Sequence, residues 1–325
     1  MVGVNDRPVT VETAGNTEAA AGGDGADGAV TAEQNGHRPT RRFRPLRWWR
    51  EIALIVVGYM IYSWVRNQFG SGTGGGVDPG PAFSHAKQII SVERAMGLYF
   101  EPSLHQWYLD LPFNGLIRLW NIYYGLLHFV ATAGVLIWLY RAAPQRYRLW
   151  RNTLLGATML AVVGFASYSL MPPRLMDNPG EFGGCQIYAA DATLPQEAGE
   201  PPCDRYDYID TVAVYGGWAS FDSEEMASVS NQYAAMPSMH IGWAMWTSFV
   251  LFPALRSRRL KALVVAYPVV TLFVVIITAN HFWLDGVGGA LALGAGYLAA
   301  RTAAQWWGLR ARQPARRVRW APASD

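Results

Sequence analysis

Charged residues are scarce in this chain. They make up 16% of its 325 residues, whereas about 25% is usual for a soluble globular protein. Hydrophobic residues make up 51%, and the 14 Trp and 16 Tyr suit the aromatic belts that form where a membrane meets water. The shortage of charge therefore argues against an ordinary soluble protein and indicates an integral membrane protein.

Cysteine is scarcer still. The two cysteines, Cys185 and Cys203, are too few for a thiolate metal site or for a scaffold held by several disulfides. The chain also lacks a basic run that contains a recognisable nucleic-acid-binding motif, although its formal net charge is +3. No nucleic-acid partner is therefore expected.

Large apolar side chains are almost absent from residues 1–40, which are rich in Gly, Ala, Asp, Glu and Thr. Such a segment buries too little surface to offset the conformational entropy lost on ordering. We predict that residues 1–40 form a disordered cytoplasmic tail and that residues 306–325, which are rich in Arg, form a basic cytoplasmic tail. The membrane domain is expected between them, over residues 41–305.

Apolar runs follow one another through this domain, at residues 51–66, 114–140, 153–171, 239–255, 262–279 and 284–302. Most of them are long enough to cross about 30 Å of hydrocarbon as α-helices, which rise about 1.5 Å per residue. The pattern predicts an all-α fold, an integral membrane bundle of six transmembrane helices. Residues 82–110 mix apolar and polar side chains at helical spacing, which predicts short helices at the membrane interface.

Four clusters of Arg and Lys flank the runs, within residues 41–50, 141–151, 256–261 and 310–319. In a six-span arrangement all four clusters lie on one side of the membrane, which the positive-inside rule assigns to the cytoplasm. Both termini are then cytoplasmic, and the long loop over residues 172–238 is extracytoplasmic. The chain is expected to be a multi-pass protein of the plasma membrane.

The predicted extracytoplasmic segments contain a flexible linker and both cysteines. Residues 70–80 are rich in Gly and also contain Ser and Asp, which is typical of a flexible linker. Cys185 and Cys203 lie in the long loop, in a compartment that permits oxidation, so a disulfide between them is expected to be possible. Two free thiols are the alternative.

The start of the fourth run carries residue types suited to phosphate chemistry. Pro237 and Ser238 favour a helix start, with Ser238 as the N-cap or a first-turn residue. The free backbone N–H groups and the dipole of such a helix end attract an anion. His240 follows within the first turn, where it could donate a proton to a leaving oxygen.

Two further segments carry complementary groups. His281 and Asp285 open the sixth run four residues apart, a spacing that puts both side chains on one face of a helix. A carboxylate bonded to one imidazole nitrogen fixes the tautomer and leaves the other nitrogen free to attack. Arg174 follows Pro172 and Pro173 just after the third run and offers a forked donor to phosphate oxygens. All three segments are predicted at the extracytoplasmic face, which indicates one site.

His128 lies about midway along the second run, near Tyr124. A histidine at that depth is usually functional or paired inside the bundle, so His128 and Tyr124 are candidate substrate-binding residues. A hydrogen bond to a neighbouring helix is the alternative for His128. The His281–Asp285 pair also has a structural alternative, and His and carboxylate side chains together could hold zinc or iron.

The motifs Pro172-Pro173-Arg174, Pro237–His240 and His281–Asp285 resemble the three signature motifs of the type 2 phosphatidic acid phosphatase superfamily. Two upstream stretches, Glu93–Leu104 and Asn121–Phe129, look like those of the branch that includes fungal inositol phosphorylceramide synthase. The resemblance covers roughly residues 85 to 300, and its motifs are specific in combination but weak one by one.

This resemblance implies a six-helix bundle with no cofactor and a metal-independent mechanism in two steps. His281 would attack phosphorus to give a phosphohistidine, Asp285 would orient it, and His240 would protonate the leaving alcohol. Arg174 and the amides around Ser238 would hold the phosphate oxygens. The substrate would be a lipid phosphate or a phospholipid, with water as acceptor in a phosphatase and an alcohol as acceptor in a head-group transferase.

The sequence departs from the superfamily pattern at two positions. Ser167 and Val275 stand where the superfamily places a Lys before the first-motif Arg and an Arg before the third-motif His. Loss of two cationic donors weakens the grip on a dianionic monoester more than on a phosphodiester, which favours head-group transfer. Two other classes stay open: a lipid-binding or transport protein without turnover, and a metal-dependent membrane enzyme with His and Asp ligands.

Overall fold

The computed structural model describes residues 47–68, 79–190, 203–217 and 231–310 of the chain. Within these residues the regular structure is helical and no β-strand is present; an isolated bridge between Leu170 and Ala234 is the pairing of extended backbone found there. The prediction of an all-α fold is thus confirmed for this part of the chain. The predicted tail over residues 1–40 lies outside it.

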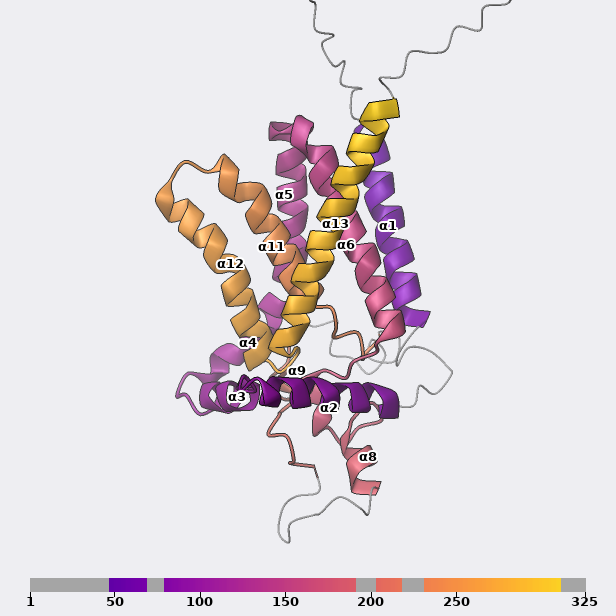
Figure 1. Cartoon of the computed structure of the whole chain (residues 1–325). Helices are drawn as coiled ribbons and strands as arrows, with labels where there is room; N and C mark the ends of the chain where they lie inside the picture. Colours follow the sequence, from indigo (N-terminus) through magenta and orange to yellow (C-terminus); the bar gives the residue numbers. More distant parts are fainter. Residues whose placement is uncertain (1–46, 69–78, 191–202, 218–230, 311–325) are drawn as a thin grey trace, which may run out of the picture. The chain divides into compact units, whose positions relative to one another are not determined.

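Helices coincide with each of the six apolar runs and cross the body of the molecule (Figure 1). They are α1 (Trp48–Gln68), the continuous segment α4 (Ile117–Ile122), η2 (Tyr123–Leu127) and α5 (His128–Ala142), α6 (Pro144–Ser167), α11 (Met239–Leu251), α12 (Arg258–Ile277) and α13 (Trp283–Arg310). Three helices in the described residues are long and apolar enough to span a membrane: Ile117–Ala142, Pro144–Ser167 and Arg258–Ile277. The full count of six spans stays a prediction.

Some helix ends differ from the predicted ones for local reasons. α6 begins at Pro144 instead of residue 153, because proline is well suited to the first helical turn, so Arg146 to Arg151 lie inside the helix. α11 has 13 residues and rises only about 20 Å before the 3₁₀ turn η3 (Phe252–Ala254). α13 continues to Arg310, so the start of the predicted basic tail is helical.

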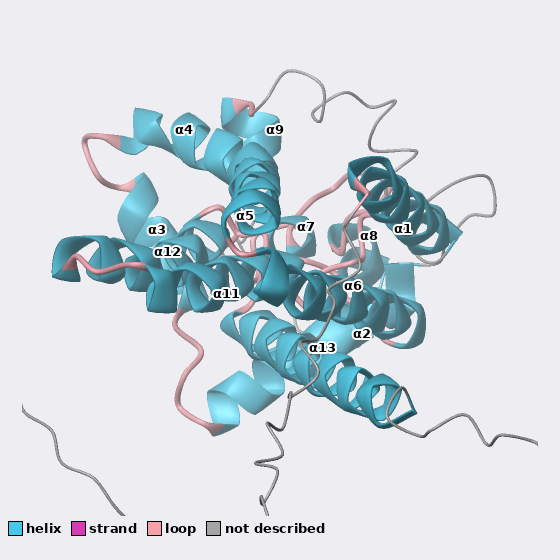
Figure 2. Ribbon diagram, turned by 90° about the horizontal axis from the view of Figure 1, so that it is seen from above, coloured by secondary structure: helices cyan, strands magenta, loops and turns pink. Residues whose placement is uncertain are grey.

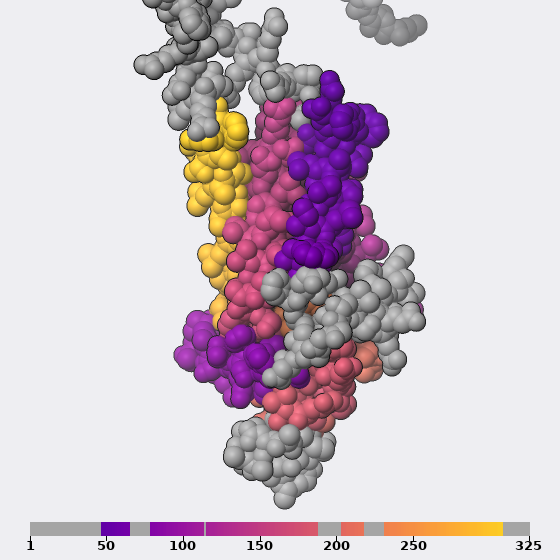
Figure 3. All heavy atoms as spheres, turned by 90° about the vertical axis from the view of Figure 1, so that its right-hand side faces the viewer, coloured from indigo at the N-terminus to yellow at the C-terminus, as the bar shows by residue number. Residues whose placement is uncertain are grey.

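α11 lies at the centre of the bundle and contacts α5, α6, α12 and α13, whereas α1 packs along α6 at one side (Figures 2 and 3). Trp246 of α11 is fully buried, and its indole N–H donates to the carbonyl of Trp150 at 2.9 Å. By contrast, α1 and α12 expose large apolar side chains such as Met60 and Leu263. Faces of this kind are stable in hydrocarbon and costly in water, which agrees with a membrane protein.

Helices α6 and α13 approach each other closely through glycine. A Cβ added to Gly296 would lie 2.6 Å from the backbone nitrogen of Ala157, so no larger residue fits there without a shift. Small residues of this kind let two helix backbones approach. The sixth run carries two rows of them at helical spacing, Gly286, Ala290 and Gly294 and, beside it, Gly288, Ala292 and Gly296. Gly294, in one of those rows, has open space around its Cα, so only part of the pattern serves packing.

Two helices, α2 (Pro79–Ala95) and α3 (Glu101–Leu109), lie across one end of the bundle (Figure 1). The start of α1, the α5–α6 and α11–α12 turns and the end of α13 lie at the opposite end. The described members of the four basic clusters therefore gather at the end of the bundle away from α2 and α3. The predicted linker over residues 70–80 lies almost wholly outside the described residues.

The predicted long loop is described in part, and it contributes the short helices α7 (Pro173–Met176), α8 (Cys185–Ala190) and α9 (Thr211–Tyr215). Cys185 and Cys203 are joined by a disulfide. The buried carboxylate of Asp177 accepts hydrogen bonds from the backbone N–H groups of Arg205, Tyr206 and Tyr208, which ties the two described parts of the loop together. Residues 191–202 and 218–230 lie outside the described residues.

Candidate active site

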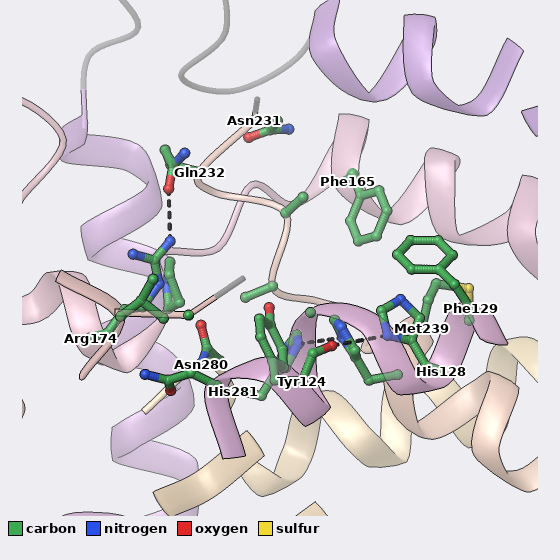
Figure 4. Close-up of a pocket in the computed structure, with 18 of the residues that line it drawn as sticks. Tyr124, His128, Phe129, Phe165, Arg174, Asn231, Gln232, Met239, Asn280 and His281 are labelled. Carbon is green, nitrogen blue, oxygen red and sulfur yellow. Dashed lines mark hydrogen bonds between the residues drawn. The ribbon is translucent and has the colours of Figure 1, made fainter. Parts of the chain in front are cut away.

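A cavity of about 440 Å³ opens at the end of the bundle covered by the loop segments. Its volume is in the range of about 300–1,000 Å³ that is usual for small-molecule sites. Five of the residues predicted for the site or its surroundings line it: Tyr124, His128, Arg174, His240 and His281. Figure 4 shows Arg174 and Gln232 on one side, Phe129 and Phe165 on the other, and Tyr124 and His281 between them. The cavity thus has a polar end and an aromatic end.

His281 lies between an acid and a second histidine. Its Nδ1 is 3.2 Å from Oδ2 of Asp285, and its Nε2 is 3.3 Å from Nδ1 of His240. Asp285 is fully buried and its Oδ2 also accepts the backbone N–H of Phe282 at 3.0 Å. With a proton on Nδ1 donated to Asp285, Nε2 carries the lone pair that points toward His240.

The predicted reason for this pairing is wrong, although the two side chains meet. α13 begins at Trp283, so His281 precedes the helix and does not share a helical face with Asp285. A tight turn after α12 positions His281 instead: its N–H donates to the carbonyl of Val275, and Ala279 adopts a positive φ of 53°. Asp285, in the first helical turn, then reaches back to the turn.

Aromatic rings enclose His240. The ring of Tyr124 stacks on it with 4.2 Å between centroids, and the ring of His128 approaches edge-on, also at 4.2 Å. His128 bonds through Nδ1 to the carbonyl of Tyr124 at 3.0 Å, within its own helical segment. Tyr124 lies in η2, a π-helical turn, and such turns occur frequently at functional sites. His128 is therefore part of the cavity wall and not a link to a neighbouring helix through this bond.

Arg174 lies in the short helix α7 and faces the cavity from its polar end. Its Nη1 donates to Oδ2 of Asp210 at 2.9 Å, and its Nη2 donates to Oε1 of Gln232 at 2.7 Å. The backbone N–H of Arg174 donates to the carbonyl of Ala279 at 2.7 Å. This last bond fixes the Arg174 segment to the turn that carries His281, which explains how distant motifs meet.

Pro237 and Ser238 lie beside the site but not on the cavity wall. Ser238 is the N-cap of α11, as predicted, yet its side chain makes no capping bond and its backbone N–H donates to the carbonyl of Asp285 at 2.8 Å. Pro237 packs against α6 and α13, where a Cβ added to Gly164 would lie 2.5 Å from its Cδ. The N–H of Ser238 is thus occupied by protein in this structure.

Ser167 and Val275, the two departures from the superfamily pattern, are not among the described residues that line the cavity. The Ser167 hydroxyl donates to the carbonyl of Val163 in its own helix, and Val275 is buried in an apolar cluster with Ile241 and Ile276. Among the described residues that line the cavity, Arg174 is the only Lys or Arg.

Two buried glutamates hold the start of α13 next to the site, a role that no local sequence pattern indicates. Glu101 Oε1 accepts the backbone N–H of Trp283 at 3.1 Å, and Glu93 Oε1 accepts that of Leu284 at 3.4 Å. Both side chains are fully buried. Burial, reinforced by the neighbouring Glu101 carboxyl, raises the pKa of Glu93 from its ordinary 4.5 to about 9, and burial also raises the pKa of Glu101. The pair thus retains a proton at neutral pH while it holds the first N–H groups of α13.

His105 joins three parts of the same support. Its Nδ1 donates to the carbonyl of Ile277 at 2.8 Å, and its Nε2 accepts the backbone N–H of Ile209 at 3.1 Å. Burial lowers the pKa of His105, which agrees with a neutral ring that donates at one nitrogen and accepts at the other. The only hint in the sequence was that Glu93, Glu101 and His105 lie in or beside a stretch that looks like the inositol phosphorylceramide synthase branch.

No group of three or more His, Cys, Asp or Glu side chains within the described residues has the geometry to hold a metal ion. In comparisons with known proteins, no curated protein and no solved structure matches the chain. A family model, that of the PAP2 superfamily, matches residues 87–299, which is more than half of the chain and includes all three motifs. The chain therefore belongs to the PAP2 superfamily, whose members are generally phosphatases or phosphotransferases.

Proposed function

We propose that this protein is a membrane enzyme that cleaves a phosphoester of a lipid through a phosphohistidine at His281. The observation that carries the proposal is the row Asp285–His281–His240, in which the nucleophilic nitrogen of one histidine faces the other histidine across 3.3 Å. An activated nucleophile needs a group that fixes its tautomer and a nearby group that handles the proton, and this row supplies both.

In the first step, Nε2 of His281 attacks phosphorus, and the bond from phosphorus to the lipid alkoxide breaks. His240, protonated at the start, gives its proton to the departing oxygen, so a neutral alcohol leaves. Asp285 stabilises the positive charge on the phosphorylated imidazole through its bond to Nδ1. Arg174 binds oxygens of the phosphoryl group and offsets their negative charge.

In the second step, an acceptor hydroxyl loses its proton to His240, and its oxygen attacks phosphorus. The N–P bond breaks and returns its electron pair to His281. With water as acceptor, a monoester substrate releases phosphate and a diester substrate releases its phosphorylated head group, whereas an alcohol as acceptor produces a new phosphoester. The protein groups are the same in both cases, so the acceptor decides whether the enzyme is a phosphatase or a transferase.

The aromatic end of the cavity supports an amphiphilic substrate. It is lined by rings from several helices: Tyr59, Tyr62, Phe129, Phe165 and Trp243. Apolar walls of this kind take aliphatic groups, while the polar end takes a head group. We propose that the substrate is a phospholipid or lipid phosphate of the extracytoplasmic leaflet.

Head-group transfer is favoured over simple phosphate release on two grounds. Ser167 and Val275 stand where the superfamily has a Lys and an Arg, two cationic groups that a dianionic monoester would use. The stretches Glu93–Leu104 and Asn121–Phe129 look like those of the inositol phosphorylceramide synthase branch. In the same proposal, six helices cross the plasma membrane, the basic end of the bundle is cytoplasmic, and the cavity opens on the extracytoplasmic side.

The proposal is tested with purified protein in detergent and EDTA, supplied with a panel of lipid phosphates and phospholipids and with candidate alcohol acceptors. Release of diacylglycerol or phosphate, and transfer of the head group, are measured for the native protein and for His281→Ala. His85→Ala is the matched control, because His85 lies on α2 and does not line the cavity. Activity in EDTA that disappears only in His281→Ala supports the proposal.

Other results point to the other two classes. Activity that EDTA abolishes and zinc or iron restores would identify a metal-dependent enzyme. Lipid binding without turnover, unchanged by His281→Ala, would identify a binding or transport protein.

A further inference from the structure

We infer that Asp210 is a specificity-determining residue, whose carboxylate neutralises Arg174 and thereby selects phosphodiester lipids over phosphomonoester lipids. The inference rests on the proposed function, because it concerns the substrate class of the same site. It is carried by a different observation, the ion pair that the phosphate-binding candidate makes inside the cavity.

The Arg174–Asp210 pair is largely shielded from water. The two side chains are 19% and 10% exposed, and Nη1 and Oδ2 are 2.9 Å apart. Asp210 and Arg174 both line the cavity, so a bound phosphate would approach the guanidinium with the carboxylate already beside it. In such a setting charges act more strongly than in bulk water, and the carboxylate subtracts from the attraction of Arg174 for anions.

Asp210 cannot withdraw easily when substrate arrives, because its other oxygen caps a helix. Oδ1 accepts the backbone N–H groups of Val212 and Ala213 at 3.2 and 3.1 Å, at the start of α9. The next residue, Thr211, is fully buried and donates its hydroxyl to Oδ1 of Asn121 at 3.0 Å. The negative charge is therefore built into the wall of the cavity.

The charges in the described cavity wall then distinguish the two substrate classes. A phosphodiester carries one negative charge, whereas a phosphomonoester carries about −1.5 to −2 at neutral pH. Arg174 is the only Lys or Arg in the described lining, and its charge is matched by Asp210. The additional charge of a monoester would have to be met by a protonated His240, while Asp285 behind His281 repels it.

The test uses two lipids that differ by one methyl ester: a diacylglycerol phosphate and its methyl phosphodiester. Both release the same diacylglycerol, which is the quantity measured. Asp210→Asn removes the charge but keeps an oxygen that can cap α9. We expect it to raise kcat/KM for the monoester, relative to the diester, by about tenfold. Asp204→Asn is the control, since Asp204 is an exposed aspartate in the same described segment, outside the cavity lining.

A second variant should act in the opposite direction. Gln232 accepts the second bond of Arg174, so Gln232→Glu places another carboxylate on the same guanidinium. We expect the monoester-to-diester ratio of kcat/KM to fall below that of the native protein. Folding is checked for both variants by gel filtration in detergent and by tryptophan fluorescence.

Binding separates this inference from the proposed function. The dissociation constants of the two lipids are measured in His281→Ala, with and without Asp210→Asn. A shift of about tenfold in their ratio toward the monoester supports the inference even where the native protein shows no turnover. An unchanged ratio in folded Asp210→Asn protein, or binding of neither lipid, overturns it. Loss of turnover in His281→Ala is a separate result, which bears on the proposed function alone.

Discussion

Two groups of polar side chains at the cavity, here called the base end and the anion end, are built in different ways. The base end, Asp285–His281–His240, comes from the start of two helices and one tight turn, and its carboxylate is fully buried. The anion end, Arg174–Asp210–Gln232, comes from the short helix α7 and two loop segments, and its Arg174 and Asp210 side chains are 19% and 10% exposed. The base end is thus joined by side chains at or beside helix starts, whereas the anion end is joined by side-chain bonds between segments that lie far apart in the chain. This difference suggests that the first determines the chemistry and the second determines which phosphoester enters.

The largest effect is expected from Asp285→Asn, which changes the carboxylate of the base end to an amide. The amide cannot stabilise a positive imidazole and can favour the wrong tautomer, which costs about 10⁴-fold in kcat in a comparable His–Asp pair. The kcat for the preferred lipid measures this loss, and gel filtration in detergent checks that the variant is folded. A loss of less than tenfold would mean that Asp285 serves mainly to hold the N–H of Phe282.

His240→Gln should cause the next largest loss. A general acid typically contributes about 10²–10⁴-fold, and the contribution is greatest when the leaving alcohol is a weak acid. We therefore expect a large loss of kcat with a diacylglycerol ester and a much smaller loss with a nitrophenyl phosphoester, whose leaving group needs no proton. Equal losses with both substrates would contradict the assignment of His240 as the acid.

Arg174→Lys changes the cation of the anion end and should cause a smaller loss of activity. Lysine keeps the charge but cannot donate to Asp210 and a phosphate with the forked geometry of a guanidinium. A loss of about 10–100-fold in kcat/KM is expected, similar to or less than the loss of one transition-state donor. Arg174→Ala is the comparison, and it should be more damaging. If Lys and Ala are equally active, the anion end does not contact phosphate.

The smallest effect concerns the glutamates behind the base end. Glu93 has a pKa of about 9 in the folded protein and an ordinary value of 4.5 when unfolded. Between these values the unfolded chain releases a proton that the folded chain keeps, so the free energy of unfolding falls as pH rises. Below about pH 4.5 both states keep the proton, so this loss of stability is absent.

Glu93→Gln should weaken this pH dependence, because glutamine keeps an oxygen for the N–H of Leu284 and does not ionise. As the pH is raised from 5 to 8, the difference in Tm between the variant and the native protein should increase in favour of the variant. The increase is roughly 2–4 °C for each kcal/mol of unfolding free energy that the variant keeps and the native protein loses. Thermal unfolding in detergent measures the difference, and Glu181→Gln on the exposed surface is the control. Parallel curves for Glu93→Gln and the native protein would mean that the proton is not on this pair.

The helices could be predicted from the sequence because long apolar runs leave few alternatives to helix. The approach of His281 to Asp285 was predicted as well, but from a helical spacing that does not apply, since the turn after α12 brings them together. The connection of Arg174 to this turn depends on one backbone bond to Ala279. A bond between segments so far apart in the chain cannot be read from local pattern.

Asp210 and Gln232 were missed for the same reason. Each lies in irregular chain without a motif, and each gains its importance only from the position of Arg174 in space. Glu93 and Glu101 appeared as polar members of interfacial helices, where charged residues are expected at the surface. Their full burial follows from the packing of α2 and α3 against the start of α13, which a periodic pattern does not reveal.

The central claim, covalent catalysis by His281, is tested most directly by trapping the intermediate. Native protein and His281→Ala are mixed briefly with a lipid substrate labelled at phosphorus, denatured in alkali and digested, and the labelled peptide is sequenced. The account predicts label on His281 that is stable in alkali and lost in acid, and no label in His281→Ala. Turnover of the same substrate without any label on the native protein, or label on another residue, would contradict it.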